Sequence, residues 1–287
     1  MKRFVIYTAL VGDYDGIIQP EAVDENFDYI LFSNDINESM IGVWQVRPIP
    51  YTDSAPTKIA RYVKTHPLEL LSEYECSIWM DANITIKSDF IYMRAYELYG
   101  NEVLISSMYH LWTHCAYDEM FNVLHCMYEH EEVILNWGQV LRKDNYPLNN
   151  GLHETGVLFR VHSNQLIIQF NQFWWSCIYQ YSKRDQLSFD YSLWKYNLQC
   201  PYFLPEGKNV RNTEHFELLV HKKNIQNFIS LNKNEAWLMR YCWKDKSKTQ
   251  KVKQIYYSIY SLPFPQLWAF LIGQCFRLKY RIELLLF

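Results

Sequence analysis

The sequence predicts an α/β fold, in which a mixed, mostly parallel sheet is flanked by helices. Short apolar runs rich in β-forming residues end in polar loops, and segments with helical spacing lie between those runs. Strands that alternate with helices along a chain typically build a parallel sheet. The length of 287 residues is also enough to bury a large core.

The first part of the chain is expected to supply the central strands. Each expected strand is an apolar run that ends at a polar turn. The segment at 57–71 has helical spacing with one interruption, at Pro67, and it leads directly into the last of these strands. The expected strands cover residues 4–10, 29–33, 43–46 and 76–80.

The second part of the chain continues the alternation. An apolar run at 156–160 predicts another buried strand, and Ser163 is a suitable N-cap for the long amphipathic helix that follows it. Helical spacing is found at residues 117–127, 131–141 and 163–181, and again from Arg184 onward.

Composition excludes one class of function and leaves others open. The net charge of −3 gives no basic field, so no nucleic-acid partner is expected. Seven scattered cysteines without metal-ligand spacing predict reduced core thiols in a cytosolic protein. Aromatic residues make up 17% of the chain, which fits an aromatic-rich core, sugar stacking or a membrane interface.

The C-terminal segment differs in composition from the rest, so we predict a domain at 1–243 and a helical tail at 244–287. Lysines cluster at 244–253, and the uncharged, aromatic-rich run at 255–276 is interrupted by proline, glycine and glutamine, which argues against a membrane span. Basic residues beside aromatic ones favour docking on an anionic membrane surface. Packing on the domain's own surface is the alternative.

A candidate metal site follows the strand at 76–80. Asp81 and Asn83 stand at its carboxyl end, where open α/β sheets bind their ligands. Two oxygen ligands separated by one small residue can face one divalent cation, and such a cation can hold a substrate diphosphate. The pattern therefore suggests a nucleotide-sugar site. A turn that only ends the strand is the alternative.

Two basic residues precede that strand. Arg61 and Lys64 are three residues apart in the expected helix at 57–71, so they share one helix face and could bind one anion. Because this helix lies beside the crevice, a diphosphate is the expected partner. A solvated surface face is the alternative.

Six short motifs also follow one another along the chain. They are VIYTALVGDYD at 5–15, YILFSND at 29–35, ARYVK at 60–64, WMDANI at 79–84, GLHETGV at 151–157 and RDQLSF at 184–189. Together they resemble the glycosyltransferase-like family of bacterial surface-polysaccharide clusters, whose plant relatives act in mucilage and pectin synthesis. That family is similar in turn to the retaining family 8 glycosyltransferases of the GT-A fold. The resemblance covers about residues 4–223.

The resemblance implies nucleotide-binding roles for several residues. Thr8, Ala9 and Tyr14 would border the nucleotide, and Tyr14 would stack on the base. Arg61, with Lys64 on the same helix face, would reach the diphosphate or the donor sugar. Lys222 would bind phosphate late in the chain.

The resemblance also implies a metal site formed by Asp81, Asn83 and His221. Asn83 stands where the family 8 enzymes carry a second aspartate, so the site has less negative charge and could differ in metal affinity or choice. A lone histidine such as His221 is by default a surface residue, and the order of the motifs is what raises it to a candidate ligand.

The sugar-binding side is expected from acids and amides that accept hydrogen bonds from hydroxyl groups. Glu154, in a loop at 152–155 before the strand at 156–160, would face the donor sugar. Asp185 and Gln186 match a helix-start pair on the acceptor side. Asp185 could instead only stabilise the helix dipole, and Glu154 could be a surface acid. The relatives often carry a basic residue where this chain has Thr113.

The function implied by the resemblance is a metal-dependent, retaining hexosyltransferase. It would use Mn²⁺ or Mg²⁺ and a nucleoside diphosphate sugar as donor, with a UDP-sugar as the favoured one. Its acceptor would be a capsule, lipopolysaccharide or lipid-linked glycan. With the tail on an anionic membrane, the protein would be cytoplasmic and peripheral to the inner membrane face. Two alternatives remain: a metal-dependent hydrolase of a lipid amide, as reported for some plant relatives, and a non-catalytic glycan-binding module.

Overall fold

The computed structural model describes residues 3–12, 14–125, 128–219 and 221. The chain divides into two compact units, and most of the described residues belong to the first, which draws on residues 1–116 and 149–223. Residues 117–148 belong to the second unit. The predicted boundary at 243/244, the tail and Lys222 lie outside the described residues.

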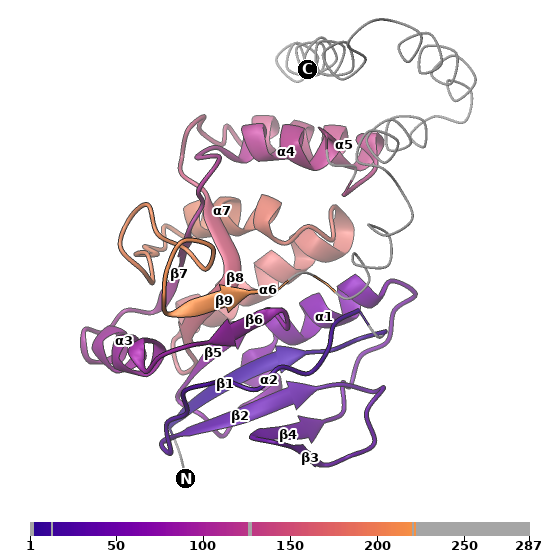
Figure 1. Ribbon diagram of the computed structural model, residues 1–287. Coiled ribbons are helices and arrows are strands. Elements are labelled where there is room, and N and C mark those ends of the chain that lie inside the picture. The colour runs from indigo at the N-terminus through magenta and orange to yellow at the C-terminus, as the bar shows by residue number, and fades with distance from the viewer. Residues whose placement is uncertain (1–2, 13, 126–127, 220, 222–287) are drawn as a thin grey trace, which may run out of the picture. The chain divides into compact units, whose positions relative to one another are not determined.

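The first unit is built on a seven-stranded mixed sheet with the order β3-β4-β2-β1-β5-β8-β7 (Figure 1). Strands β4, β2, β1 and β5 pair in parallel, β3 and β8 run against their neighbours, and β7 is antiparallel to β8. The predicted α/β fold with a mostly parallel sheet is therefore confirmed. The strands are β1 (Phe4–Ala9), β2 (Phe27–Phe32), β3 (Met40–Ile41), β4 (Trp44–Arg47), β5 (Cys76–Met80), β7 (Ile105–Tyr109) and β8 (His153–Val161).

The order of the strands defines a ligand-binding crevice. From β1 the chain builds outward to β2 and β4, and it then returns to place β5 on the other side of β1. The connections therefore diverge between β1 and β5, and ligands of open α/β sheets bind outside the carboxyl ends of strands at such a point. Asp81, the first residue after β5, lies at this edge.

Five helices of the first unit cover the two faces of the sheet. Pro56 opens α1, where its fixed φ suits the first turn. Helix α6 is capped by Asn164, whose side chain accepts a hydrogen bond from the Leu166 amide. The helices are α1 (Pro56–Thr65), α2 (Pro67–Leu70), α3 (Phe90–Gly100), α6 (Gln165–Gln180) and α7 (Gln186–Lys195).

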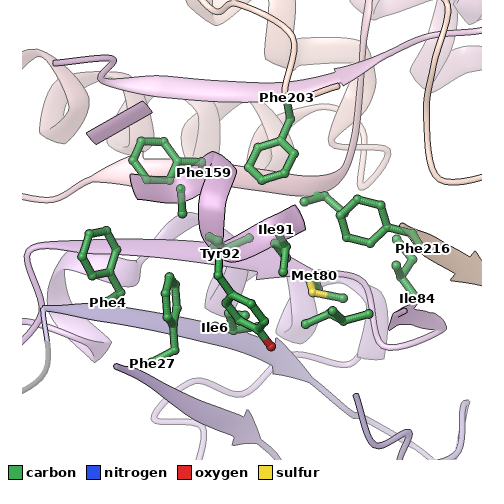
Figure 2. Packing of buried hydrophobic residues seen from close by; sticks show 14 of the residues in the cluster. Phe4, Ile6, Phe27, Met80, Ile84, Ile91, Tyr92, Phe159, Phe203 and Phe216 are labelled. Carbon is green, nitrogen blue, oxygen red and sulfur yellow. The ribbon is translucent and has the colours of Figure 1, made fainter. Parts of the chain in front are cut away.

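Alternate residues of each strand face two separate apolar clusters. Phe4 and Ile6 of β1 face the cluster that includes α3, and in Figure 2 the rings of Phe4, Phe27 and Tyr92 lie close together in it. Successive ring centroids there are 5.0 Å apart. The alternate residues of β1, such as Val5 and Tyr7, point to the other face of the sheet and belong to the cluster formed with α1 and α6. Burial on both faces explains why these strands read as continuous apolar runs.

A second, two-stranded sheet ties the end of the first unit to the crevice. Strand β6 (Ile84–Ile86) pairs antiparallel with β9 (Phe216–Leu218). The amide of Leu219 then donates to the Asn83 carbonyl, 2.8 Å away. The chain near residue 219 is thus held two residues from Asp81.

The described part of the second unit contains α4 (Ala116–His125), which starts at its boundary, and α5 (Glu131–Lys143). The Tyr117 hydroxyl donates to the Tyr146 carbonyl, 3.0 Å away, and so joins the start of α4 to the residues after α5. Within the portion of the chain that the structure describes, none of the helices is long and apolar enough to span a bilayer.

Some local predictions were wrong. Asn164, not Ser163, caps α6, because the Asn164 side-chain oxygen accepts a hydrogen bond from the second amide of the helix, that of Leu166, as in an Asx turn. Residues 153–155 belong to β8 rather than to a loop. The helical segment expected at 57–71, with its interruption at Pro67, is indeed two helices, which are divided at His66. The local patterns of the sequence do not predict α3, β3, β6, β7 or β9.

Strand β8 begins at a buried ion pair. His153 Nδ1 lies 2.6 Å from Asp190 Oδ1 of α7, the His153 amide donates to Asp190 Oδ2, and Nε2 lies 2.9 Å from the Cys200 carbonyl. Burial alone lowers the pKa of His153, but Cys200 and Asp190 outweigh burial, so this pKa lies well above its ordinary value.

We expect this pair to make the protein less stable as the pH rises. Unfolded histidine loses its proton at about pH 6.5, so the stabilisation is fully present below that pH and is lost towards the higher folded-state pKa, by about 1.4 kcal/mol per pH unit. Urea denaturation of the full chain between about pH 5.5 and 8.5 measures the effect. The variant Asp190→Asn should show a flatter dependence, and equal slopes in the two proteins would contradict this prediction.

Candidate functional site

Asp81 stands at the centre of the candidate site. Its amide donates to the Gly156 carbonyl of β8, 2.8 Å away, and its Oδ1 accepts from Trp79 Nε1 at 2.8 Å. Its side chain is 32% exposed, so the carboxylate is accessible from the crevice. A Cβ on Gly156 would lie 3.6 Å from Asp81 Oδ2 and 3.1 Å from Ile84 Cδ1, which shows how closely β8 passes the carboxylate.

The two predicted cations of α1 converge, as the i, i+3 spacing implied, on carboxylates of the chain itself. Lys64 Nζ lies 2.6 Å from Asp185 Oδ2 and 3.6 Å from Asp81 Oδ1. Arg61 Nε lies 2.9 Å from Asp185 Oδ1, and its Nη1 lies 3.7 Å from Asp81 Oδ1. Neither residue is on a solvated face: Lys64 is fully buried and the Arg61 side chain is 15% exposed.

Asp185 holds this cluster together. It is buried at the N-terminus of α7, and the Thr155 hydroxyl of β8 donates to its Oδ2 at 2.8 Å. Burial alone would raise the pKa of Asp185, but Arg61 and Lys64 outweigh burial and hold the pKa below its usual range. Asp185 is therefore a buried carboxylate that positions two cations beside Asp81.

A third cation, Arg160, binds the backbone of Lys64. Arg160 of β8 is fully buried, and it donates to the Lys64 carbonyl, to the Tyr7 hydroxyl and to Asn171 Oδ1. Burial lowers the pKa of Arg160, and burial raises the pKa of Tyr7 to about 12. In the described part of the chain no carboxylate pairs with Arg160, so three cations face two carboxylates around the end of α1.

An irregularity in β8 brings its residues to the cluster. The register with β7 shifts between Ser107 and Met108, so that Ser107 pairs with Leu158 and Met108 pairs with Glu154. Ser107 Oγ closes the irregularity by bonding to the carbonyls of Glu154 and Val157, at 2.9 and 3.2 Å. Such bulges re-aim side chains next to functional sites. Here the bulge carries Thr155 and Gly156.

A pocket opens on the β1 side of Asp81. Its walls come from the ends of β1 and β5, the loop at 16–18 and Trp44, and they include Thr8 and Asp81. Its volume is about 300 Å³ with the open solvent at its mouth included, which is small for a ligand site. Thr8 Oγ1 is buried there without a hydrogen-bond partner. Ala9 faces the apolar cluster with α1 instead.

The three predicted metal ligands lie at the same edge of the sheet but are separately engaged. Asn83 Nδ2 donates to the Leu219 carbonyl at 2.9 Å. His221 Nδ1 lies 2.9 Å from Asp15 Oδ2, and the His221 ring is 4.7 Å from that of Tyr14, which is 40% exposed. Over the described ranges, no group of three or more His, Cys, Asp or Glu side chains is close enough to hold a metal ion.

The two remaining predicted sugar contacts differ in availability. Gln186 Nε2 is buried without a hydrogen-bond partner at the start of α7, next to Asp185. The Glu154 carboxylate is instead already engaged, because Oε2 accepts from Asn209 Nδ2 at 2.7 Å and Oε1 pairs with Arg211.

Several residues of the site are not predicted by the sequence patterns. Thr155 and Arg160 bind the Lys64 region across the sheet, and Asp15 binds His221 from a loop far away in the sequence. Thr155 lies within the motif at 151–157 and Asp15 within the motif at 5–15, but neither motif shows which residue its side chain binds. Arg160 and Asp15 are separated from their partners by 96 and 206 positions, so no short motif contains both members of either pair.

Comparisons with known proteins found similarity to a family model and to solved structures. Residues 1–220 match the family model described as TOD1/MUCI70, glycosyltransferase-like domain. The structure is similar to the bifunctional glycosyltransferase WbbM in its apo form, with a TM-score of 0.39 and 11% identity over 71% of this chain. This chain spans only 38% of that protein. It is also similar to apo mouse xyloside xylosyltransferase 1, with a TM-score of 0.32 and 9% identity over 70% of this chain and 77% of that one. No curated protein matches the sequence.

Proposed function

The chain belongs to the TOD1/MUCI70 glycosyltransferase-like domain family, and on that premise we propose that it transfers a sugar from a nucleoside diphosphate donor to a glycan or lipid-linked glycan acceptor. The observation that carries the proposal is the pair Arg61 and Lys64, held beside Asp81 at the carboxyl edge of β1 and β5. A cationic pair in this crevice suits a diphosphate.

The charge balance favours an anionic ligand. Three cations and two carboxylates leave one positive charge around the end of α1, in a region shielded from water. Charge-assisted contacts are stronger where the local dielectric is low. A diphosphate that approached Asp81 would therefore gain from Arg61 and Lys64 even though both already bind Asp185.

Each residue has a distinct role in the proposed transfer. Arg61 and Lys64 stabilise the negative charge that develops on the departing diphosphate as the glycosidic bond breaks. Asp185 and Thr155 keep the two cations in place before substrate arrives, so little reorganisation is needed. Gln186 has a buried donor, Nε2, available for a hydroxyl of a sugar substrate.

The proposal includes a divalent metal, Mn²⁺ or Mg²⁺, held by Asp81, Asn83 and His221. These residues offer two oxygen ligands and one imidazole nitrogen, a set that fits Mn²⁺. Asn83 Nδ2 donates to the Leu219 carbonyl, so the side-chain oxygen of Asn83, Oδ1, is not part of that hydrogen bond. When bound, the metal would add Lewis-acid stabilisation of the diphosphate. We also propose that the donor is a UDP-sugar, that the transferred sugar is a hexose, and that its anomeric configuration is retained.

The function can be tested by measuring nucleotide release from a panel of UDP-, GDP- and CDP-sugars by the full chain, with Mn²⁺ and with EDTA. We expect release from at least one donor, and tighter binding of that nucleotide with the metal in calorimetry. No binding or turnover of any nucleotide sugar would overturn the proposal. Release of a fatty acid from a lipid amide without nucleotide would replace it with the hydrolase alternative.

Localisation at the cytoplasmic face of the membrane, through residues 244–287, is also a proposal. Each basic residue near an anionic surface contributes about 1 kcal/mol, so four or five of them give reversible binding. We therefore expect the full chain to sediment with anionic vesicles and to be released in large part by high salt. Equal sedimentation with neutral and anionic vesicles, or binding that salt does not change, would contradict this expectation.

A further inference from the structure

Trp112 is the most exposed large hydrophobic side chain in the described part of the chain, with 65% of its surface in solvent. It nevertheless has a fixed environment. The guanidinium carbon of Arg211 lies over the ring, 4.8 Å from its centroid, and the His110 ring meets it at 5.9 Å with an interplanar angle of 81°. Arg211 thus covers one face of the Trp112 ring. Because 65% of the Trp112 surface is exposed, the opposite face of the ring is open to solvent.

The cation on Trp112 is held in place by buried groups. Arg211 Nη1 pairs with Glu154 Oε1, and Glu154 Oε2 accepts from Asn209 Nδ2 at 2.7 Å. Asn209 is fully buried, and its Oδ1 accepts from the Arg211 amide at 2.8 Å. These bonds fix the loop that carries Arg211, so the Trp112 ring rests on a rigid support.

The aromatic platform is defined as Trp112 with Arg211 and Glu154, and its member Glu154 is close along β8 to the proposed transfer site. Glu154 directly precedes Thr155, which binds Asp185, and it lies two residues from Gly156 beside Asp81. At about 3.3 Å per residue, its backbone is within about 7 Å of that of Gly156. In the sheet, β5 with Asp81 lies between β1, which borders the pocket, and β8, which carries Glu154; Trp112 follows β7, the next strand beyond β8.

We propose that Trp112 is the stacking residue of the acceptor subsite and binds a neutral pyranose ring. That this sugar is the acceptor of the transfer rests on the proposed function. An open aromatic face takes up the C–H face of a sugar, and the polar edges of the Arg211–Glu154 pair are within reach of hydroxyl groups. Because Glu154 neutralises Arg211, the platform has no excess charge to attract an acidic sugar. The donor occupies the β1 side of Asp81 and the acceptor the β8 side.

Binding can be tested without any nucleotide. Saturation-transfer NMR of the full chain with the methyl glycosides of glucose, galactose, mannose and xylose should detect at least one ligand. We expect Trp112→Ala to weaken that binding about tenfold and Trp112→Phe to keep most of it. Tyr179→Ala is the matched control, since Tyr179 is 55% exposed with Lys58 Nζ 5.1 Å from its ring centroid but lies on α6, away from Glu154.

Kinetics then separate the subsite from the transferase proposal. With the donor that the chain turns over, Trp112→Ala should raise the acceptor KM about tenfold and leave the donor KM and acceptor-free nucleotide release unchanged. Unchanged glycoside binding and acceptor KM in Trp112→Ala would overturn the subsite and leave the transferase intact. Trp112-dependent glycoside binding without any nucleotide-sugar binding would keep the sugar site and refute the transferase. Wild-type protein that binds none of the four glycosides would also overturn the subsite.

Discussion

Replacing Asp185 with alanine should destabilise the protein by about 3–5 kcal/mol, because the change leaves Lys64 and Arg61 buried without their shared carboxylate. Lys64 is fully buried and cannot turn to solvent without disrupting α1. The midpoint of urea denaturation measures the loss. A full chain that unfolds at the wild-type midpoint would show that the cluster does not contribute to stability.

Two further measurements identify the cause of that loss. Asp185→Asn keeps the volume and an acceptor for Thr155, so it should cost less than the alanine variant. The folded-state pKa of Asp185 is below its usual range, so its stabilisation is present above about pH 4, the unfolded value, and is lost as the pH falls through the folded pKa. The acid limb of the stability profile should therefore be flatter in Asp185→Asn.

Replacing Arg61 with alanine should lower turnover of the proposed reaction about 10²–10³-fold, the usual cost of removing one preorganised group that stabilises transition-state charge. The effect should fall on kcat more than on the donor KM, because the charge on the diphosphate grows as the bond breaks. Steady-state kinetics with the donor identified by nucleotide release measure both constants.

Lys58→Ala provides the matched control for Arg61. Lys58 is on the same helix, but its Nζ donates to the Tyr179 carbonyl, and the residue does not contact Asp81. We expect wild-type kinetics from this variant. An Arg61→Ala enzyme with kcat within a few-fold of wild type, and unchanged unfolding, would exclude Arg61 from the transfer step.

Local patterns in the sequence predicted the centre of the site but not its partners. Asp81 was identified because it ends an apolar strand, and Arg61 and Lys64 were identified because they are three residues apart in a helix. The anion that these two cations bind is Asp185, 121 positions after Lys64, and only the closed fold brings them together. The motif that contains Asp185 predicts a place on the acceptor side, which stays a prediction, and it does not show that Asp185 binds the two cations.

The same limit applies to Glu154. Its residue type and position predict an acid that binds sugar hydroxyl groups, and no short motif shows that its carboxylate also pairs with Arg211, 57 positions later. Strand β7 and helix α3 were missed because neither has a strong periodic pattern, and their burial comes from packing against β8 and the cluster around Phe27 and Tyr92.

The two hydrogen bonds between Leu219 and Asn83 have a consequence for the crevice. They fasten the backbone at 219 two residues from Asp81. A substitution that loosens residue 219, late in the chain, should therefore disturb the position of Asp81 through Asn83, although these two bonds join Leu219 to Asn83 and not to the cluster around Asp185.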